Sequence, residues 1–332
     1  MPPDTRLSPS RTISVALCTY NGETYLQEQL ASIAGQDRPP DEVVVSDDSS
    51  TDSTTDIVRE FIRSAPFEVR LLRTGRRAGS TSNFELAVGA CTGDIIALAD
   101  QDDVWLPRKL ARIEREFAEV PGLAMAFSDA EVVDRQLQSL GFNLWKAVGF
   151  TPARQRMFDE GRGLEVLITG NKVTGATMAF DASYRDLILP FDDSEFHDAW
   201  IALMITAVAK VSAIHEPLIQ YRQHGRNQVG AKVRDMAGMA EAARQPGASI
   251  YTNMAEFFDD ALTHLSSRPQ YPLSPVAIEL LRGRAEFLRF RANLPENRLK
   301  RAYTVTRRLS RDGYFRYANG LKSFANDLVR PD

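Results

Sequence analysis

The sequence predicts an α/β fold, with a mainly parallel sheet between helices and a helical extension at the C-terminal end. Two patterns lead to this prediction. In the first half, short apolar runs alternate with segments of helical periodicity, which is typical of βαβ units. In roughly the last eighty residues, apolar side chains recur at helical spacing, for example at Leu281, Ala285, Leu288 and Ala292.

The composition is that of an ordinary globular protein of about two domains' length. Of its 332 residues 43% are apolar and 25% charged, which excludes a collagen-like, disordered or disulfide-stapled chain. Cys18 and Cys91 form no CxxC pair, so we expect reduced core residues in a cytoplasmic protein. No signal-peptide-like run follows Met1, and the most apolar stretch, Ile201 to Ile214, is too short for a membrane span.

Charge is distributed unevenly along the chain. Arg282 to Asp332 holds 13 basic and 5 acidic residues, a local charge of +8, although the whole chain carries −4. An acidic body with a basic tail is not a typical nucleic-acid-binding layout; it suits an enzyme whose end contacts an anionic surface such as the inner membrane face. The alternatives are a solvated helix face or a homodimer interface. The basic side chains concerned are Arg307, Arg308, Arg311, Arg316 and Lys322.

The expected elements of the first half follow from apolar runs and helix signals. Asp52 is the expected N-cap of the helix through Ile57, Val58, Phe61 and Ile62, and Pro107 starts the helix through Leu110, Ile113 and Phe117. The remaining expected helices are Glu23–Ile33 and Phe84–Ala90. The expected strands are Ile13–Cys18, Val43–Val45, Phe67–Leu72, Ile95–Ala99 and Leu123–Phe127.

The pattern weakens from Asp134 to Gly170, which predicts an insertion or a mobile loop. Order returns with one helix, Ala199–Ala209, and a flexible stretch follows at Gly225–Gly247. The expected strands here are Val173–Phe180, Val211–Ile214 and Leu218–Tyr221.

Polar clusters follow several of the expected strands, where ligands collect in an open parallel sheet. They begin at Thr19, Asp47, Asp100, His197 and Tyr221. Neither G-x-G-x-x-G after the first strand nor G-x-x-x-x-G-K-[ST] is present, so phosphate would have to be neutralised by a metal rather than by a glycine loop.

Asp100-Gln101-Asp102 is the candidate metal-binding segment. Two carboxylates one residue apart on a turn can face one point, and their hard oxygens suit Mg²⁺ or Mn²⁺ on a diphosphate. The alternative is an acidic loop in which Asp103 caps the helix at Pro107.

Asp48 ends another buried strand and could accept the N–H of a uracil or thymine ring. The alternative is a solvated turn.

Asp198 lies at the start of a helix, where the helix dipole keeps a carboxylate ionised and able to act as a general base. It could instead be an ordinary N-cap, with His197 orienting it. His224, at a strand end, is a candidate metal or diphosphate ligand, although a lone histidine is more often structural. We expect His215 and His264 to be structural.

Taken together, these segments resemble family 2 glycosyltransferases of GT-A fold. The resemblance extends over about residues 12 to 225 and is carried by ISVALCTYNGETYLQEQLASI, DEVVVSDDSSTDST and GDIIALADQDDVWLPRKL. More narrowly, FSDAEVVD, NKVTGATMAF, HDAW and YRQHGRNQVGA are similar to the rhamnosyltransferase-like branch, which builds bacterial surface polysaccharides.

The resemblance implies roles for individual positions. Asp48 would hold the pyrimidine, Asp100 would lie near the ribose, and Asp198 would deprotonate the acceptor hydroxyl. Nucleotide binding would fall to Thr19, Tyr20, Asn21, Glu23, Asp48, Asp100 and Gln101. Mg²⁺ or Mn²⁺ would be held by Asp102 and His224, and the sugar and acceptor would be lined by Gly175, His197 and Trp200.

The implied function is an inverting, metal-dependent glycosyltransferase. The expected donor is dTDP-L-rhamnose, and the expected acceptor is a glycan or lipid-linked oligosaccharide. One alternative is a nucleotidyltransferase, but Thr19 to Thr24 lacks the basic residue that it requires. The other is a non-catalytic subunit that binds a nucleotide sugar.

Two features depart from the family pattern. His197 stands where many relatives have Glu, and Gly79 to Ser82 lacks a basic residue, which leaves Arg76 or Arg77 as candidates for the diphosphate. The Gln-x-x-Arg-Trp signature of processive synthases is also missing, so we expect one sugar to be added per encounter. The expected organisation is a disordered N-terminus (1–11), a GT-A catalytic domain (12–228), a flexible linker (229–250) and a helical, basic region (251–332).

Overall fold

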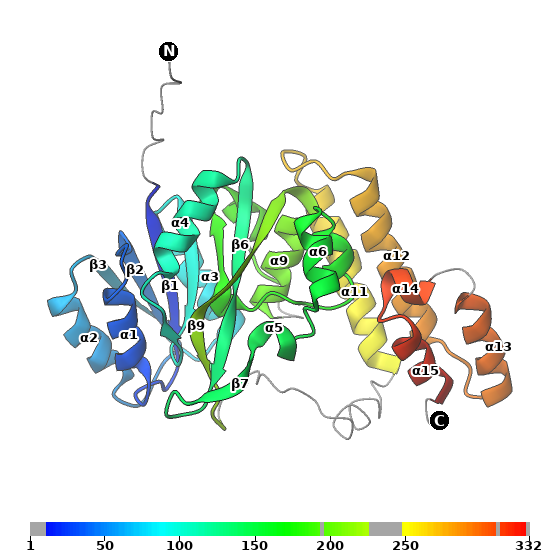
Figure 1. The fold of residues 1–332 in the computed structure, drawn as a ribbon, viewed down its shortest axis with the longest axis horizontal. Coiled ribbons are helices and arrows are strands. Elements are labelled where there is room, and N and C mark those ends of the chain that lie inside the picture. Colours follow the sequence, from blue (N-terminus) through cyan, green and yellow to red (C-terminus); the bar gives the residue numbers. More distant parts are fainter. Residues whose placement is uncertain (1–10, 193–195, 226–247, 310–312, 330–332) are drawn as a thin grey trace, which may run out of the picture.

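The computed structural model describes residues 11–192, 196–225, 248–309 and 313–329. Figure 1 shows an α/β body at one end of the molecule and the C-terminal helices at the other. Residues 1–10 of the expected disordered N-terminus and 229–247 of the expected linker lie outside the described residues. Arg11 is described, and its guanidinium donates a 2.6 Å hydrogen bond to the Asp181 carboxylate.

The described strands form one mixed sheet in the order β3-β2-β1-β4-β8-β6-β9-β5, with β7 paired to β6. Strands β1 to β4 are parallel, β8 enters antiparallel between β4 and β6, and β6 pairs with β9 in parallel. The α/β class is confirmed, although the sheet as a whole is less parallel than expected. The strands are β1 Ile13–Thr19, β2 Glu42–Asp47, β3 Glu68–Arg73, β4 Ile95–Asp100, β5 Val104–Trp105, β6 Leu123–Val133, β7 Ser139–Asn143, β8 Met178–Asp181 and β9 Lys210–Arg222.

Helices cover both faces of the sheet, because successive side chains of a buried strand point to opposite faces. Val15 and Leu17 of β1 join a core with α1, α2 and α4, whereas Ala16 and Cys18 join a core with α3, α9, α11 and α12. Cys18 and Cys91 are buried free thiols, as expected. The helices of the body are α1 Leu26–Ala34, α2 Thr54–Ser64, α3 Ser80–Ala90, α4 Lys109–Glu119, α5 Leu144–Ala147, α6 Pro152–Asp159, α7 Gly163–Leu167, α8 Arg185–Ile188 and α9 His197–Val208, with 3₁₀ turns η1 Gly175–Thr177 and η2 Ala182–Tyr184.

The segment from Asp134 to Gly170 is not a loop, so the loop alternative of that prediction was wrong. It forms β7, α5, α6 and α7, and packs Trp145, Phe150 and Phe158 around Phe127, with ring centroids 5.3–5.8 Å from the Phe127 ring. Its helices have four to eight residues, which is too short for a helical period to appear in the sequence.

Two expected strand boundaries also differ. The strand expected at Val173–Phe180 begins only at Met178, after the 3₁₀ turn η1. The two strands expected at 211–214 and 218–221 are one strand, β9, whose register against β6 shifts near Pro217. Proline lacks the ladder N–H, so a bulge there keeps both halves paired.

The C-terminal region is helical, as predicted, and its first described helix starts at Ala248. Its helices are α11 Ala248–Ser266, α12 Pro275–Ala292, α13 Arg298–Leu309, α14 Gly313–Tyr317 and α15 Leu321–Val329. A small core of Phe287, Val305, Tyr314 and Ala318 joins α12, α13 and α14. Within the described ranges, no helix combines the length and apolarity needed to cross a membrane.

Candidate functional site

The carboxyl ends of β1, β2, β4 and β9 lie at one edge of the sheet, the lower edge in Figure 1. The loops that follow the first three of these strands are tied together by side-chain hydrogen bonds. Gln101 accepts from the Tyr20 amide at 2.9 Å and donates to the Tyr20 carbonyl at 3.0 Å. A Cβ on Gly22 would lie 2.1 Å from Gln101 Oε1, so a larger residue there would displace the Gln101 side chain from Tyr20. The Arg77 guanidinium lies 4.2 Å from the centroid of the Tyr20 ring.

Several predicted nucleotide-binding side chains shape these loops. Asn21, at a φ of 46°, accepts from the Thr51 amide, and Glu23 accepts from the Ser53 amide. Thr19 donates to the buried Asp47 carboxylate at 3.0 Å. Their side-chain oxygens therefore position the loop between β2 and α2.

Asp48 is buried, which rules out a solvated turn. Its two carboxylate oxygens accept from the Ala78 and Gly79 amides at 2.6 and 2.9 Å, and so hold the loop before α3. Asp52 lies before Ser53, the N-cap of α2, and accepts from the Thr54 amide. Burial raises the pKa of Asp52, but hydrogen bonds from Thr54 outweigh it and leave the pKa below its ordinary value.

The two predicted metal ligands meet, although 122 positions separate them. Asp102 Oδ2 lies 2.6 Å from His224 Nε2, and the His224 ring lies 5.0 Å from that of Tyr25. Asp103 is buried and accepts from the Arg222 amide at 3.0 Å. The alternative in which Asp103 caps the following helix is therefore wrong.

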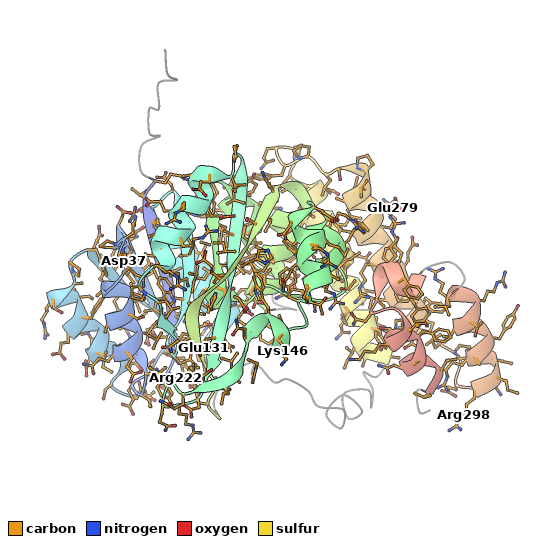
Figure 2. The ribbon with its side chains drawn as sticks, viewed as in Figure 1. Asp37, Glu131, Lys146, Arg222, Glu279 and Arg298 are labelled. Carbon is orange, nitrogen blue, oxygen red and sulfur yellow. The ribbon has the colours of Figure 1, made fainter. Side chains whose placement is uncertain are left out.

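Arg222 is a site residue that sequence reasoning missed. Its guanidinium donates to the carbonyls of Asp102 and Arg135, forms an ion pair with Glu28 and lies over the Tyr25 ring. Figure 2 labels Arg222 at the lower edge of the sheet. These contacts fasten the end of β9, and with it His224, to the Asp102 loop. The available signal was an arginine two positions before His224, in the polar segment that begins at Tyr221.

Four carboxylates from two separate segments share one electrostatic environment. Burial, with the nearby charges of Asp102 and Asp198, raises the pKa of Asp100 to about 7. Burial also raises the pKa of Asp103. Such a cluster favours a cation, since bringing negative charges together is costly.

The ligands offered by the protein fit a divalent cation that the substrate also helps to coordinate. Within the described ranges, no three His, Cys, Asp or Glu side chains converge closely enough to hold a metal alone. Asp102 and His224 offer one carboxylate and one imidazole, a set that suits Mn²⁺ and leaves positions for diphosphate oxygens and water.

Lys109 is a second residue that sequence reasoning missed. Its side chain is fully buried, with Nζ 2.7 Å from the Ala176 carbonyl and 3.6 Å from the centroid of the Trp105 ring. Burial lowers the pKa of Lys109 to about 7, against the opposing effect of Asp103 and Asp100. The available signal was a lysine four positions before Ile113, on the apolar face of α4.

Asp198 lies in the first turn of α9, whose N-cap is Phe196, so the N-cap alternative is wrong. Its oxygens accept from the Gly175 amide and from Asn171 Nδ2, each at 3.2 Å. These two donors orient the carboxylate, and the helix dipole stabilises its charge. Asn171 was not predicted as a site residue, although it begins the NKVTGATMAF motif directly after the segment expected to be irregular.

His197 packs inside the protein rather than against the Asp198 carboxylate. Its ring stacks on Phe84 at 4.0 Å, and neither ring nitrogen has a hydrogen-bond partner within the described part of the chain. Burial lowers the pKa of His197 to about 3, so the ring is neutral near pH 7. A Cβ on Gly175 would lie 2.9 Å from its Nε2, which explains why glycine stands there.

Trp200 does not line the site, in contrast to the sequence-based expectation. It is 2% exposed, donates to the Ile188 carbonyl and packs edge-on against His264 of α11. Residues two positions apart on a helix point to nearly opposite sides. Trp200 therefore faces the core, whereas Asp198 faces the site.

Residues 14–167 match the family described as Glycosyl transferase family 2. This match, over somewhat less than half of the chain, supports a family 2 glycosyltransferase. The chain is also 26% identical to an uncharacterized glycosyltransferase of Nostoc, over 79% of this chain and 79% of the relative. It is also 36% identical to the dTDP-rhamnosyl transferase RfbG of Shigella flexneri, over 28% of this chain and 34% of RfbG.

Solved structures show that the fold is that of GT-A glycosyltransferases, as the sequence predicted. The S. aureus TarS fragment 1-349 in complex with UDP-GlcNAc superposes with a TM-score of 0.53 at 18% identity, covering 96% of this chain and 89% of that fragment. The mannosyltransferase of Pyrobaculum calidifontis in complex with GDP-Man and Mn²⁺ gives a TM-score of 0.51 at 20% identity, covering 91% and 75% of the two chains.

Proposed function

We propose that this protein is a glycosyltransferase that moves a sugar from a nucleoside diphosphate sugar to an acceptor hydroxyl, with inversion at the anomeric carbon. The observation that carries the proposal is the meeting of Asp102 with His224 at 2.6 Å, beside the electrostatically linked Asp100 and Asp198. Asp102 and His224 can hold a metal-bound donor diphosphate, and Asp198 can act as a base close to it.

Asp198 acts as the general base. As the acceptor oxygen attacks the anomeric carbon, the Asp198 carboxylate takes the hydroxyl proton, and the bond from that carbon to the diphosphate oxygen breaks. Asp102 and His224 would hold a divalent cation, which when bound would stabilise negative charge on the departing nucleoside diphosphate. Attack opposite the leaving group, with one base and no covalent nucleophile, inverts the anomeric centre.

The proposed donor is dTDP-L-rhamnose, with Asp48 and the Tyr20 loop at the pyrimidine. The support is the similarity to a dTDP-rhamnosyl transferase, and the relatives solved with UDP-GlcNAc or GDP-Man offer the competing donors. We place the reaction on the cytoplasmic side of the membrane, with a glycan or lipid-linked acceptor in surface polysaccharide assembly.

The donor and the metal can be tested together by thermal shift. Bound ligand raises the melting temperature by mass action, so dTDP-L-rhamnose should give the largest shift among dTDP-, UDP- and GDP-sugars, and only with Mn²⁺ or Mg²⁺. The variants Asp102→Asn and His224→Gln should need more Mn²⁺ for the same shift. A larger shift with a UDP-sugar would overturn the donor, and shifts unaffected by EDTA would overturn the metal.

The base is tested by Asp198→Asn, which keeps the shape of the side chain and removes its basicity. We expect turnover to fall by roughly 10² to 10⁴-fold while the donor-induced thermal shift is retained. Asp56→Asn, on the exposed face of α2, is the matched control and should keep full activity. Unchanged turnover in Asp198→Asn would reject the base, and donor binding without turnover in the wild type would favour a non-catalytic binding subunit.

A further inference from the structure

The most exposed large apolar side chains of the described residues lie on two C-terminal helices. Leu299 and Tyr303 of α13 are 83% and 69% exposed, and Leu321 and Val329 of α15 are 62% and 75% exposed. The members of each pair are four or eight positions apart, so each pair forms a stripe along one side of its helix.

The opposite sides of these helices are already packed. Val305 of α13 is buried with Phe287 and Tyr314, and Arg301 donates to the Pro295 and Glu296 carbonyls. In α15, Asp327 is buried against Arg291. The exposed stripes therefore face away from the core of this chain, at the end of the molecule farthest from α1 and α2 (Figure 1).

The charge flanking the stripes has one sign. Helix α13 contains five basic residues and no acidic residue, and Asp327 is the single acidic residue of α15. Arg298, Lys300 and Lys322 are exposed, and Figure 2 shows Arg298 at the outer end of α13.

Other cations that the sequence suggested for an anionic surface are engaged elsewhere or lie outside the described residues. Arg308 lies over the Phe290 ring, and Arg316 pairs with Glu279 at 2.8 Å. Arg311 lies outside the described residues. The cations considered below are therefore the exposed ones beside the apolar stripes, Arg298, Lys300 and Lys322.

We propose that the two apolar stripes and the exposed cations beside them, together called the lipid-facing surface, dock onto a membrane rich in anionic lipid headgroups. Apolar side chains would enter the headgroup boundary while the flanking cations contact phosphate groups, the arrangement of interfacial helices. A second copy of this chain fits less well, because it would bring cations of like sign together. The lipid-facing surface comprises Leu299, Tyr303, Leu321, Val329, Arg298, Lys300 and Lys322.

The inference rests on the proposed function in one respect only. An enzyme with a lipid-linked acceptor gains from being held at the bilayer, but membrane binding needs neither donor nor turnover. Vesicle binding and the donor-induced thermal shift can therefore fail independently.

The experiment is co-sedimentation of the full chain with vesicles of phosphatidylcholine, alone or with phosphatidylglycerol. We expect binding to the anionic vesicles that weakens with salt. Lys300→Gln with Lys322→Gln should weaken binding by about 30-fold, at roughly fivefold for each cation removed. Leu299→Ser with Val329→Ser should weaken binding at every salt concentration.

Matched controls remove similar groups elsewhere on the surface. Leu140→Ser on β7 and Lys146→Gln on α5 change exposed side chains of the body and should bind vesicles like the wild type. Equal binding to neutral vesicles, or a loss in the control variants as large as in the test variants, would overturn the proposal. A dimer in solution that Leu299→Ser dissociates would do so too, by assigning the surface to self-association.

Discussion

Lys109 joins the two halves of the candidate site. Its ammonium donates to the Ala176 carbonyl in η1, and the neighbouring Gly175 amide donates to Asp198. The same ammonium is the counter-charge that opposes the raised pKa values of Asp100 and Asp103. One buried side chain thus positions the loop of the proposed base and moderates the charge of the proposed metal-binding loop.

We expect Lys109→Met to lower the free energy of unfolding by about 1–3 kcal/mol, because a buried carbonyl loses its donor. Turnover should fall as well, because the loop that carries the Gly175 amide, which donates to Asp198, would lose its tie to Lys109. The measurement is urea unfolding alongside steady-state kinetics, with the exposed Lys146→Gln as control. A variant with wild-type stability and turnover would show that Lys109 does not position the loop that contacts Asp198.

The site was predictable from the sequence where a residue's role depends on its position at a strand end. Asp102 and His224 were both selected on that ground, and the sheet brings them together. Lys109 and Arg222 could not be identified in this way, because their contacts come from segments distant in the sequence. Trp200 was misplaced because the direction of a helical side chain depends on which face of the helix is buried.

At the scale of elements, Glu42 holds three segments at the amino end of the sheet. Its carboxylate, at the start of β2, accepts from Ser14 of β1, from Thr92 before β4 and from Arg70 of β3. Burial raises the pKa of Glu42, but these hydrogen bonds outweigh it and lower the pKa to about 2.

The pKa of Glu42 lies below its ordinary value of 4.5. Its carboxylate therefore stabilises the fold fully above pH 4.5, and this stabilisation is lost as the pH falls toward 2. Glu42→Gln should therefore be less stable than the wild type at pH 7, and the difference should shrink between pH 4.5 and 2. Urea titrations across this range measure it, with the exposed Glu68→Gln as control. A difference that is constant with pH would contradict the assignment.

Elements with a long, regular pattern were predicted well. The buried strands β1 and β4 and the helix α4 came from unbroken apolar runs or clear helical spacing. The helices α5 to α7 were missed because each is shorter than the window in which periodicity can be seen. Their order comes from tertiary packing around Phe127, which no local pattern encodes.

At the scale of the whole molecule, the C-terminal helices share a core with the sheet. Trp200 of α9 packs against Phe257 and His264 of α11, in a cluster that extends from Cys18 to Leu288. The chain should therefore unfold as one cooperative unit rather than as a catalytic body and a separate tail.

Calorimetry should show a single transition, and Phe258→Ala in α11 should lower its midpoint without splitting it. The buried phenyl is 5% exposed, so its loss should cost about 3–5 kcal/mol. Ile62→Ala, at a partly exposed site on α2, is the control. Two resolved transitions, with the first alone moved by Phe258→Ala, would show that the tail folds independently.

The pairing of Gln101 with both backbone groups of Tyr20 makes two loops behave as one rigid part. In the proposed site, a nucleobase that shifts Tyr20 on entering would carry the Asp102 turn with it, so nucleobase binding and the affinity for the proposed cation would be thermodynamically linked. Such linkage is reciprocal: if a nucleoside tightens the hold on Mn²⁺ by some factor, Mn²⁺ tightens the hold on the nucleoside by the same factor.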